Sequence, residues 1–344
     1  MSYKNIYLLY VVRLVASLSF IGGILVPFYT EWAGMEESII PLIQLWFMVW
    51  AALLEVPTGA VADYISRKVS IVSGLLLVGV GFIVYIVRPE LVFFLLGELI
   101  IAIGVALISG ADESLMYDSL LQMGEQEKAT KISSRSGTFG MFGLLLGAPI
   151  GSLIAANYNY PLVFILTGVT SLLAMIIALF LKEPKVHEKE IVEGIGYFHT
   201  LTTGLQILWK HTNVKQLDFD LAIVHALSAT IIWMNQIALT SVLVPIAWFG
   251  FISSSGILTE IVVANLIDPF ERRWGTLRVA RWTTVWSAVG LLMVGLGVLL
   301  NNQWVVLVGI MPPFSILIGR KSMMRAQVNH HISSGQRATV LSAI

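Results

Sequence analysis

The sequence contains no cysteine and very few charged residues. Without cysteine the chain can form no disulfide, use no thiol nucleophile and build no cysteine metal site. Charged residues make up 12% of the 344 positions, against about 25% in soluble domains. Hydrophobic residues reach 57% and the mean hydropathy is +0.83. This composition predicts an all-α membrane protein that crosses the lipid bilayer several times.

The signatures of several enzyme classes are also missing. The sequence has no Gly-x-Ser-x-Gly, no His-Glu-x-x-His and no P-loop, so neither an intramembrane hydrolase nor ATP-driven transport is supported. His225 is the one histidine inside an expected span, and no second ligand follows it at a metal spacing. We therefore expect no enzyme, no cofactor, no metal and no nucleic-acid partner.

Long apolar runs recur along the chain with short polar breaks between them. A membrane helix needs about 20 mostly apolar residues. The expected spans are 6–28, 39–62, 69–87, 91–113, 136–156, 161–181, 217–241, 243–266, 282–300 and 303–320.

Positive charge supports this division, because cytoplasmic loops collect Lys and Arg. Of the 21 Lys and Arg residues, only Arg88 falls on the other side and only Arg13 falls inside a span. We expect an even number of spans, a cytoplasmic N-terminus and a place in the plasma or inner membrane.

One polar stretch divides the chain. After Lys182-Glu183-Pro184, apolar residues recur at helical spacing among charges, which is typical of an amphipathic helix on the membrane surface. The prediction is an N-terminal six-helix bundle at 1–184, a cytoplasmic linker at 185–215 and a C-terminal bundle at 216–344.

The segment between the second and third spans carries a recognisable charged loop. Gly59 is followed by Asp63 four residues later and then by Arg67 and Lys68. This run resembles the gating loop of the major facilitator superfamily, although Tyr64 stands where a basic residue is usual. The resemblance implies a transporter that rocks two helical bundles around a central site.

The second half repeats the charges of the first. Glu55, Asp63, Arg67 and Lys68 recur at one constant offset, with Ala264 in place of the glycine. Parallel repeats of this kind build the two pseudo-symmetric halves of such transporters. The recurring positions are Glu260, Asp268, Arg272 and Arg273.

The family architecture of six plus six helices predicts two more spans than these. The run from Arg337 to Ser342 resembles the start of helix eleven, which in the family faces the loop aspartate. The sequence thus looks like a C-terminally truncated member, with six plus four spans and only the start of helix eleven.

Three ionisable residues are expected at one depth in the membrane. Counting about 1.5 Å per helical residue places Arg13, Glu55 and Asp112 at a similar distance from the cytoplasmic side. Buried charges at such depth are costly and usually functional. We interpret them, with Glu113, as candidates for proton coupling, in which Arg13 balances either Glu55 or Asp112. The alternative is a static ion pair that fixes helix packing.

Two further groups of residues are candidates. Asp118 ends an acidic run like one in a branch of bacterial permeases and is expected to pair with Arg67 at the gate, unless it is simply solvated. The substrate-cavity candidates are Gln44, Trp50, Trp233 and Gln236, with interfacial anchoring or packing as the alternative.

The predicted function is secondary transport of a small solute by a monomer, coupled to protons. In span five, Gly143, Gly147 and Gly151 surround Pro149, a partial match to the family's antiporter run, which favours efflux over simple helix packing. The alternatives are an uptake permease for a sugar or metabolite and an inactive or sensor-like truncated protein.

Overall fold

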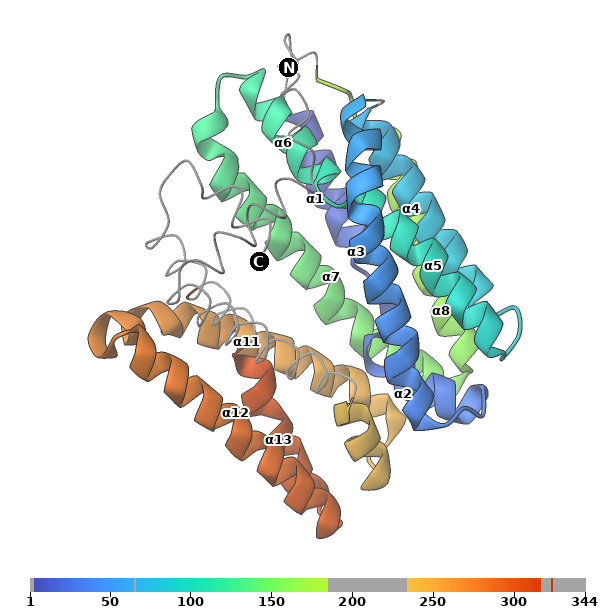
Figure 1. Cartoon of the computed structure of the whole chain (residues 1–344), viewed down its shortest axis with the longest axis vertical. Coiled ribbons are helices and arrows are strands. Elements are labelled where there is room, and N and C mark those ends of the chain that lie inside the picture. The colour runs from blue at the N-terminus through green and yellow to red at the C-terminus, as the bar shows by residue number, and fades with distance from the viewer. Residues whose placement is uncertain (1–2, 65, 185–233, 317–322, 324–344) are drawn as a thin grey trace. The chain divides into compact units, whose positions relative to one another are not determined.

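The computed structural model describes residues 3–64, 66–184, 234–316 and 323, and the part described is helical throughout (Figure 1). Eight of its helices are long and apolar enough to cross a membrane. The predicted linker at 185–215, the run from Arg337 to Ser342, His225 and Trp233 lie outside the described residues.

The chain forms two compact units. One comprises Met1–Lys189 with Pro245–Ser254, and the other comprises Glu190–Val244 with Ser255–Ile344. Residues 246–254 open the helix α11 (Ile246–Trp274), so this helix contributes to both units.

The first unit contains the six expected N-terminal spans. Its main helices are α1 (Lys4–Ala16), α3 (Ile40–Tyr64), α4 (Arg67–Val84), α5 (Leu91–Ile108), α6 (Ala111–Leu121), α7 (Ala129–Asn157) and α8 (Tyr160–Ala178). Helix α4 packs against α5 and α8, α3 packs against α5, and α1 packs against α7 and α8. The α4–α5 contact is close because Gly74 faces the carbonyl of Gly104, where a Cβ would lie 2.6 Å from that oxygen.

Helix ends follow local chemistry. The Asn159 side chain accepts the N–H of Leu162 at 2.9 Å and caps α8, whose second residue is Pro161. Ser66 likewise accepts the N–H of Val69 at 3.2 Å at the start of α4. These caps explain why the boundaries of α4 and α8 lie within a few residues of those expected.

Two of the expected spans are interrupted along their length. The first span stops as an α-helix at Ala16 and continues after Ser19 through the 3₁₀ turn Phe20–Gly23, the short α2 (Leu25–Pro27) and the π-helical turn Phe28–Trp32. The fourth breaks between α5 and α6 because Gly110 adopts a left-handed conformation with φ +73°. Apolar periodicity does not detect such breaks.

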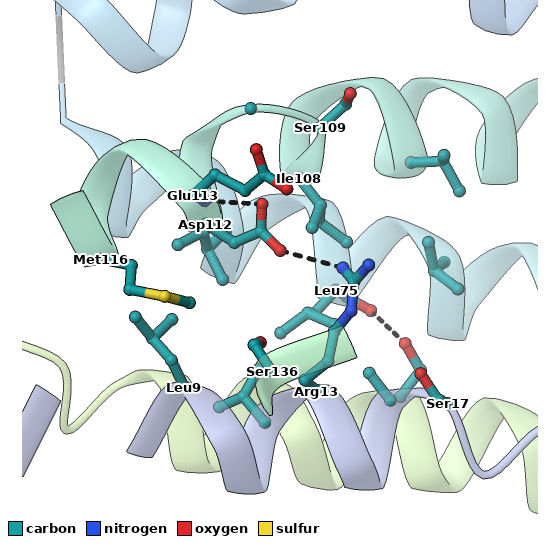
Figure 2. Close-up of a pocket in the computed structure, with 17 residues that line it drawn as sticks. Leu9, Arg13, Ser17, Leu75, Ile108, Ser109, Asp112, Glu113, Met116 and Ser136 are labelled. Carbon is teal, nitrogen blue, oxygen red and sulfur yellow. Dashed lines mark hydrogen bonds and ion pairs between the residues drawn. The ribbon is translucent and has the colours of Figure 1, made fainter. Parts of the chain in front are cut away.

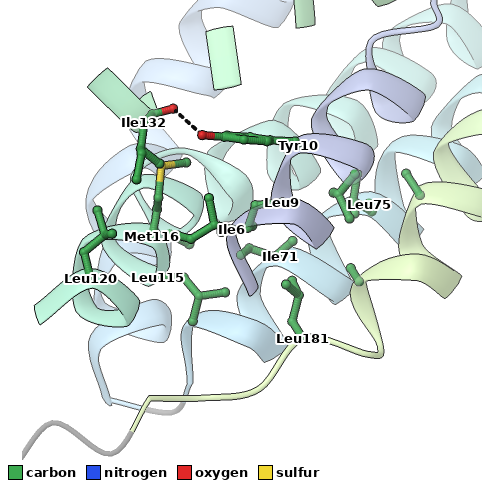
Figure 3. Packing of buried hydrophobic residues seen from close by; sticks show 14 residues of the cluster. Ile6, Leu9, Tyr10, Ile71, Leu75, Leu115, Met116, Leu120, Ile132 and Leu181 are labelled. Atoms are coloured by element: carbon green, nitrogen blue, oxygen red, sulfur yellow. Dashed lines mark hydrogen bonds between the residues drawn. The ribbon is translucent and has the colours of Figure 1, made fainter. Parts of the chain in front are cut away.

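A buried apolar cluster joins five helices at the end of the unit where α6 lies (Figure 3). Ile6 and Leu9 of α1 meet Ile71 of α4 and Leu115 of α6, and all four are at most 3% exposed. Tyr10 belongs to the same cluster and its hydroxyl donates to the carbonyl of Ile132 on α7 at 3.4 Å.

The second unit is described over helical residues 234–241, the later part of α11, α12 (Thr276–Leu299) and α13 (Gln303–Ser315). Helices α12 and α13 pack together through Gly290 and Gly309, whose backbones approach closely. Helix α11 extends to Trp274, beyond the expected end at 266. As a result Arg272 and Arg273 close α11, whereas Arg67 and Lys68 open α4, so the two halves use the repeated charges differently.

Candidate functional site

A pocket lies inside the first unit where both interrupted spans break (Figure 2). It encloses about 570 Å³, which is within the range of small-molecule sites. Ser17 follows the end of α1, and Ser109 and Gly110 form the break between α5 and α6. Backbone that leaves the helix at membrane depth is tolerated where it lines a cavity. The breaks and the pocket therefore belong to one feature.

Arg13 and Asp112 meet in this pocket. Arg13 Nη1 lies 2.9 Å from Asp112 Oδ2. Arg13 is in the last turn of α1, where the helix dipole is negative, and Asp112 is in the first turn of α6, where it is positive. Both charges are therefore favoured by their own helices as well as by each other.

The break at Gly110 changes the setting of the acidic run. The sequence places Asp112 and Glu113 at the end of a span, but the structure puts them at the start of a new helix. The N–H of Glu113 donates to Asp112 Oδ1 at 2.8 Å, which fixes the orientation of that carboxylate. Glu113 itself is exposed and also lines the pocket.

Glu55 is the other of the two acids that the sequence offers as a partner for Arg13. It is exposed on α3 and is not among the residues that line the pocket. Residue counting gives the depth of a side chain along a helix, whereas the direction it faces depends on how that helix packs. In the described part of the chain, Arg13 is paired with Asp112 instead.

The charged loop from Gly59 to Lys68 makes contacts of its own. The Arg67 guanidinium contacts the carboxylate of Asp118 and donates to the carbonyl of Ser114 at 2.8 Å. Gly59 and Asp63 lie near the end of α3, as the loop pattern predicts, although the Asp63 side chain is outside the described part. The structure thus ties the start of α4 to α6.

Glu183 is a residue of this region that the sequence reasoning missed. Its carboxylate accepts the backbone N–H groups of Arg67 and Lys68, each at 3.0 Å, and the hydroxyl of Ser66 at 2.9 Å. It therefore caps the N-terminus of α4 from a distant part of the chain. The only sequence signal was a charge after a helix stop.

The other candidates are dispersed. Gln236 is 1% exposed within helical residues 234–241, and Glu260 is 8% exposed on α11. Trp50 is half-buried on α3, and no described residue forms a hydrogen bond with its indole N–H. Gln44 is committed to Glu98 on α5, with Nε2 to Oε1 at 3.1 Å. None of these residues lines the pocket around Arg13 and Asp112. Asp268 lies on α11, and its side chain is outside the described part.

Comparison with known proteins gives one family match. The family model described as Major Facilitator Superfamily matches residues 8–344. No curated protein matches the sequence.

Solved structures share the fold at low sequence identity. The nucleoside transporter NupG is 13% identical with a TM-score of 0.77, over 98% of this chain and 85% of that one. A bacterial homologue of the human lysosomal transporter Spinster, in an inward-facing and unoccupied conformation, is 16% identical with a TM-score of 0.72, over 98% and 77%. A POT family transporter in complex with 5-aminolevulinic acid is 15% identical with a TM-score of 0.65, over 99% and 86%.

Proposed function

The chain belongs to the Major Facilitator Superfamily and is a multi-pass membrane protein with the fold of a secondary transporter of small solutes, and on this premise we propose that it exports its solute in exchange for protons. The observation that carries the proposal is the Arg13–Asp112 pair in the pocket where two spans break. Transporter sites are typically built from such discontinuous helices.

Protonation of Asp112 would change this site in a defined way. A neutral Asp112 no longer balances Arg13, so the guanidinium is released toward the pocket, and the site can no longer hold a cationic group of the solute. Restoring the carboxylate re-forms the pair. The deprotonated Asp112 carboxylate, in contrast, can bind a cationic group of the solute. Solute and proton then compete for one carboxylate, which is the requirement for exchange.

The direction and setting of transport belong to the same proposal. The glycine face of α7, with Pro149, supports export by its likeness to the antiporter run. The sorting of Lys and Arg supports a cytoplasmic N-terminus in the plasma or inner membrane. We further propose that the chain works as a monomer divided into bundles at 1–184 and 216–344 around a linker. Gly59, Asp63, Arg67, Lys68 and Asp118 act as its cytoplasmic gate.

The test uses the whole chain in vesicles that hold a pH-sensitive dye. Uridine, 5-aminolevulinic acid and ethidium are offered in turn. Uridine is a nucleoside, and one structural neighbour is a nucleoside transporter; another neighbour was solved in complex with 5-aminolevulinic acid. Ethidium is included as an organic cation. For a solute that is carried, we expect its movement to change the lumenal pH.

Asp112→Asn separates transport from coupling. We expect this variant to retain exchange of labelled for unlabelled solute and to lose accumulation driven by a pH gradient. Glu90→Gln, an exposed carboxylate far along the chain from the pocket, serves as control and should behave as the wild type. Unchanged pH-driven accumulation in Asp112→Asn would refute the role of Asp112.

A further inference from the structure

A second acidic group is buried in the first unit, away from the pocket. Glu98 is 7% exposed and lies on α5, seven residues after the helix begins at Leu91. At about 1.5 Å per residue this is roughly 10 Å into the span. This end of α5 lies on the side of the unit that carries the loop after Trp32 and the loop between α4 and α5. The loop between α3 and α4 lies on the opposite side.

In the described part of the chain, the hydrogen-bond donors that reach Glu98 are all neutral. Gln44 Nε2 of α3 lies 3.1 Å from Oε1, and the hydroxyl of Tyr85, just after α4, contacts the same oxygen. The hydroxyl of Tyr29 lies 2.9 Å from that of Tyr85. Gln44 and Tyr85 thus both donate to one carboxylate oxygen, and Tyr29 joins them through the hydroxyl of Tyr85.

No cation balances this carboxylate among the described residues. The titratable groups that face it are the phenols of Tyr85 and Tyr29. The charged residues in the described loops at this end are Glu31, Glu36, Glu37, Arg88 and Glu90, and all are exposed. Arg88 pairs with Glu90, with Nη1 3.8 Å from Oε1. Glu98 therefore differs from Asp112, which has an arginine.

Aromatic rings shield the tyrosine hydroxyls from water. Tyr29 and Phe94 are unexposed, with ring centroids 5.2 Å apart, and Tyr85 stacks on Phe164 at 5.3 Å. An ionised carboxylate in such surroundings carries a large desolvation cost that neutral donors only partly offset. A carboxylic acid carries no such cost.

The geometry points to Glu98 as a proton-binding site that is distinct from the Arg13–Asp112 pair. When the proton leaves, Gln44 and Tyr85 stabilise the carboxylate by donating hydrogen bonds to it, and Tyr29 supports Tyr85. When Glu98 is charged, Tyr85 must donate to it and Tyr29 must donate to Tyr85. When Glu98 is protonated, this order is no longer imposed. The charge on Glu98 thus sets the hydrogen-bond links among α3, α5 and the π-helical turn.

The site can be tested without any transported solute. Infrared difference spectra of the full chain in lipid vesicles, recorded between alkaline and acidic pH, report the carbonyl stretch of each carboxylic acid that gains a proton. We expect a band in the wild type that Glu98→Gln lacks and that Glu90→Gln and Asp112→Asn retain. Tyr85→Phe should shift the band, because it removes one donor to the carboxyl group.

The outcomes separate this site from the proposed function. A difference spectrum for Glu98→Gln identical to that of the wild type would overturn the proposal. If Glu98→Gln does not fold, an unshifted band in both Tyr85→Phe and Gln44→Leu would overturn it equally. Failure of Asp112→Asn to alter coupling would leave the Glu98 band in place and would bear only on the pocket.

Discussion

Arg13 and Asp112 form an ion pair across the ends of two interrupted helices, with Nη1 2.9 Å from Oδ2. The Arg13 side chain is 47% exposed and that of Asp112 is 18% exposed, so the pair is open to the pocket. An accessible pair contributes little stability, commonly up to about 1 kcal/mol. Such a pair can open and close during a transport cycle.

A double-mutant cycle measures this coupling. Arg13→Gln, Asp112→Asn and the double variant should give a coupling free energy of at most about 1 kcal/mol in thermal unfolding. The control cycle uses Arg88→Gln and Glu90→Gln, whose atoms are 3.8 Å apart and whose side chains are more than half exposed; we expect a coupling near zero there. A coupling of several kcal/mol at Arg13 would indicate a static structural pair instead.

The Arg67 contacts predict a sharp difference between neighbouring basic residues. Arg67→Gln removes the contact with Asp118 and the bond to the Ser114 carbonyl and should lower the free energy of unfolding by about 1–3 kcal/mol. Lys68→Gln keeps the backbone N–H that Glu183 accepts and should change it by less than about 0.5 kcal/mol. Equal thermal midpoints for the two variants would contradict the tie between α4 and α6.

Glycines of α7 provide the clearest packing test. A Cβ at Gly151 would lie 1.8 Å from the carbonyl oxygen of Phe20, so Gly151→Ala must displace the segment after α1 and should cost about 1–3 kcal/mol or more. Gly137 on the same helix has no atom within 4 Å of such a Cβ, and Gly137→Ala should raise stability by up to about 1 kcal/mol. Thermal midpoints of the two variants should therefore move in opposite directions, and a shared direction would refute this packing.

Glu125 predicts a pH dependence outside the spans. Hydrogen bonds from Lys128 and Tyr3 hold the pKa of its carboxyl below the ordinary value. A lowered folded-state pKa adds stability above the unfolded pKa of about 4.3, and this stability is lost as the pH falls through the folded value. Glu125→Gln should therefore lower the thermal midpoint near neutral pH and lose less on acidification than the wild type. The control variant is Glu127→Gln, which should follow the wild type. If the thermal midpoints of Glu125→Gln and the wild type fall equally as the pH is lowered, the effect is contradicted.

Much of the fold follows from the sequence because the bilayer restricts the possibilities. Long apolar runs must become helices in lipid, so spans one to six, eight and nine were correctly predicted as membrane spans, with ends that differ by several residues. The family was also recognisable from one loop, since Gly59 to Lys68 carries its spacing. Both properties depend on local composition and order along the chain.

The candidate site was predictable only in part. Depth along a helix follows from residue number, and it brought Arg13 and Asp112 to one level. Depth does not give the direction of a side chain, which is why the sequence could not choose between Glu55 and Asp112, of which only Asp112 lines the pocket.

Sequence alone determined that this protein is a helical membrane protein of a transporter superfamily, because burial in lipid and a short charged motif are properties of composition and spacing. Tertiary structure alone decided that Gly110 breaks a span at the pocket, that Glu183 caps α4 and that Glu98 meets Gln44 and Tyr85. Each depends on contacts between residues far apart in the chain or on a single backbone conformation, and neither leaves a periodic signal in the sequence.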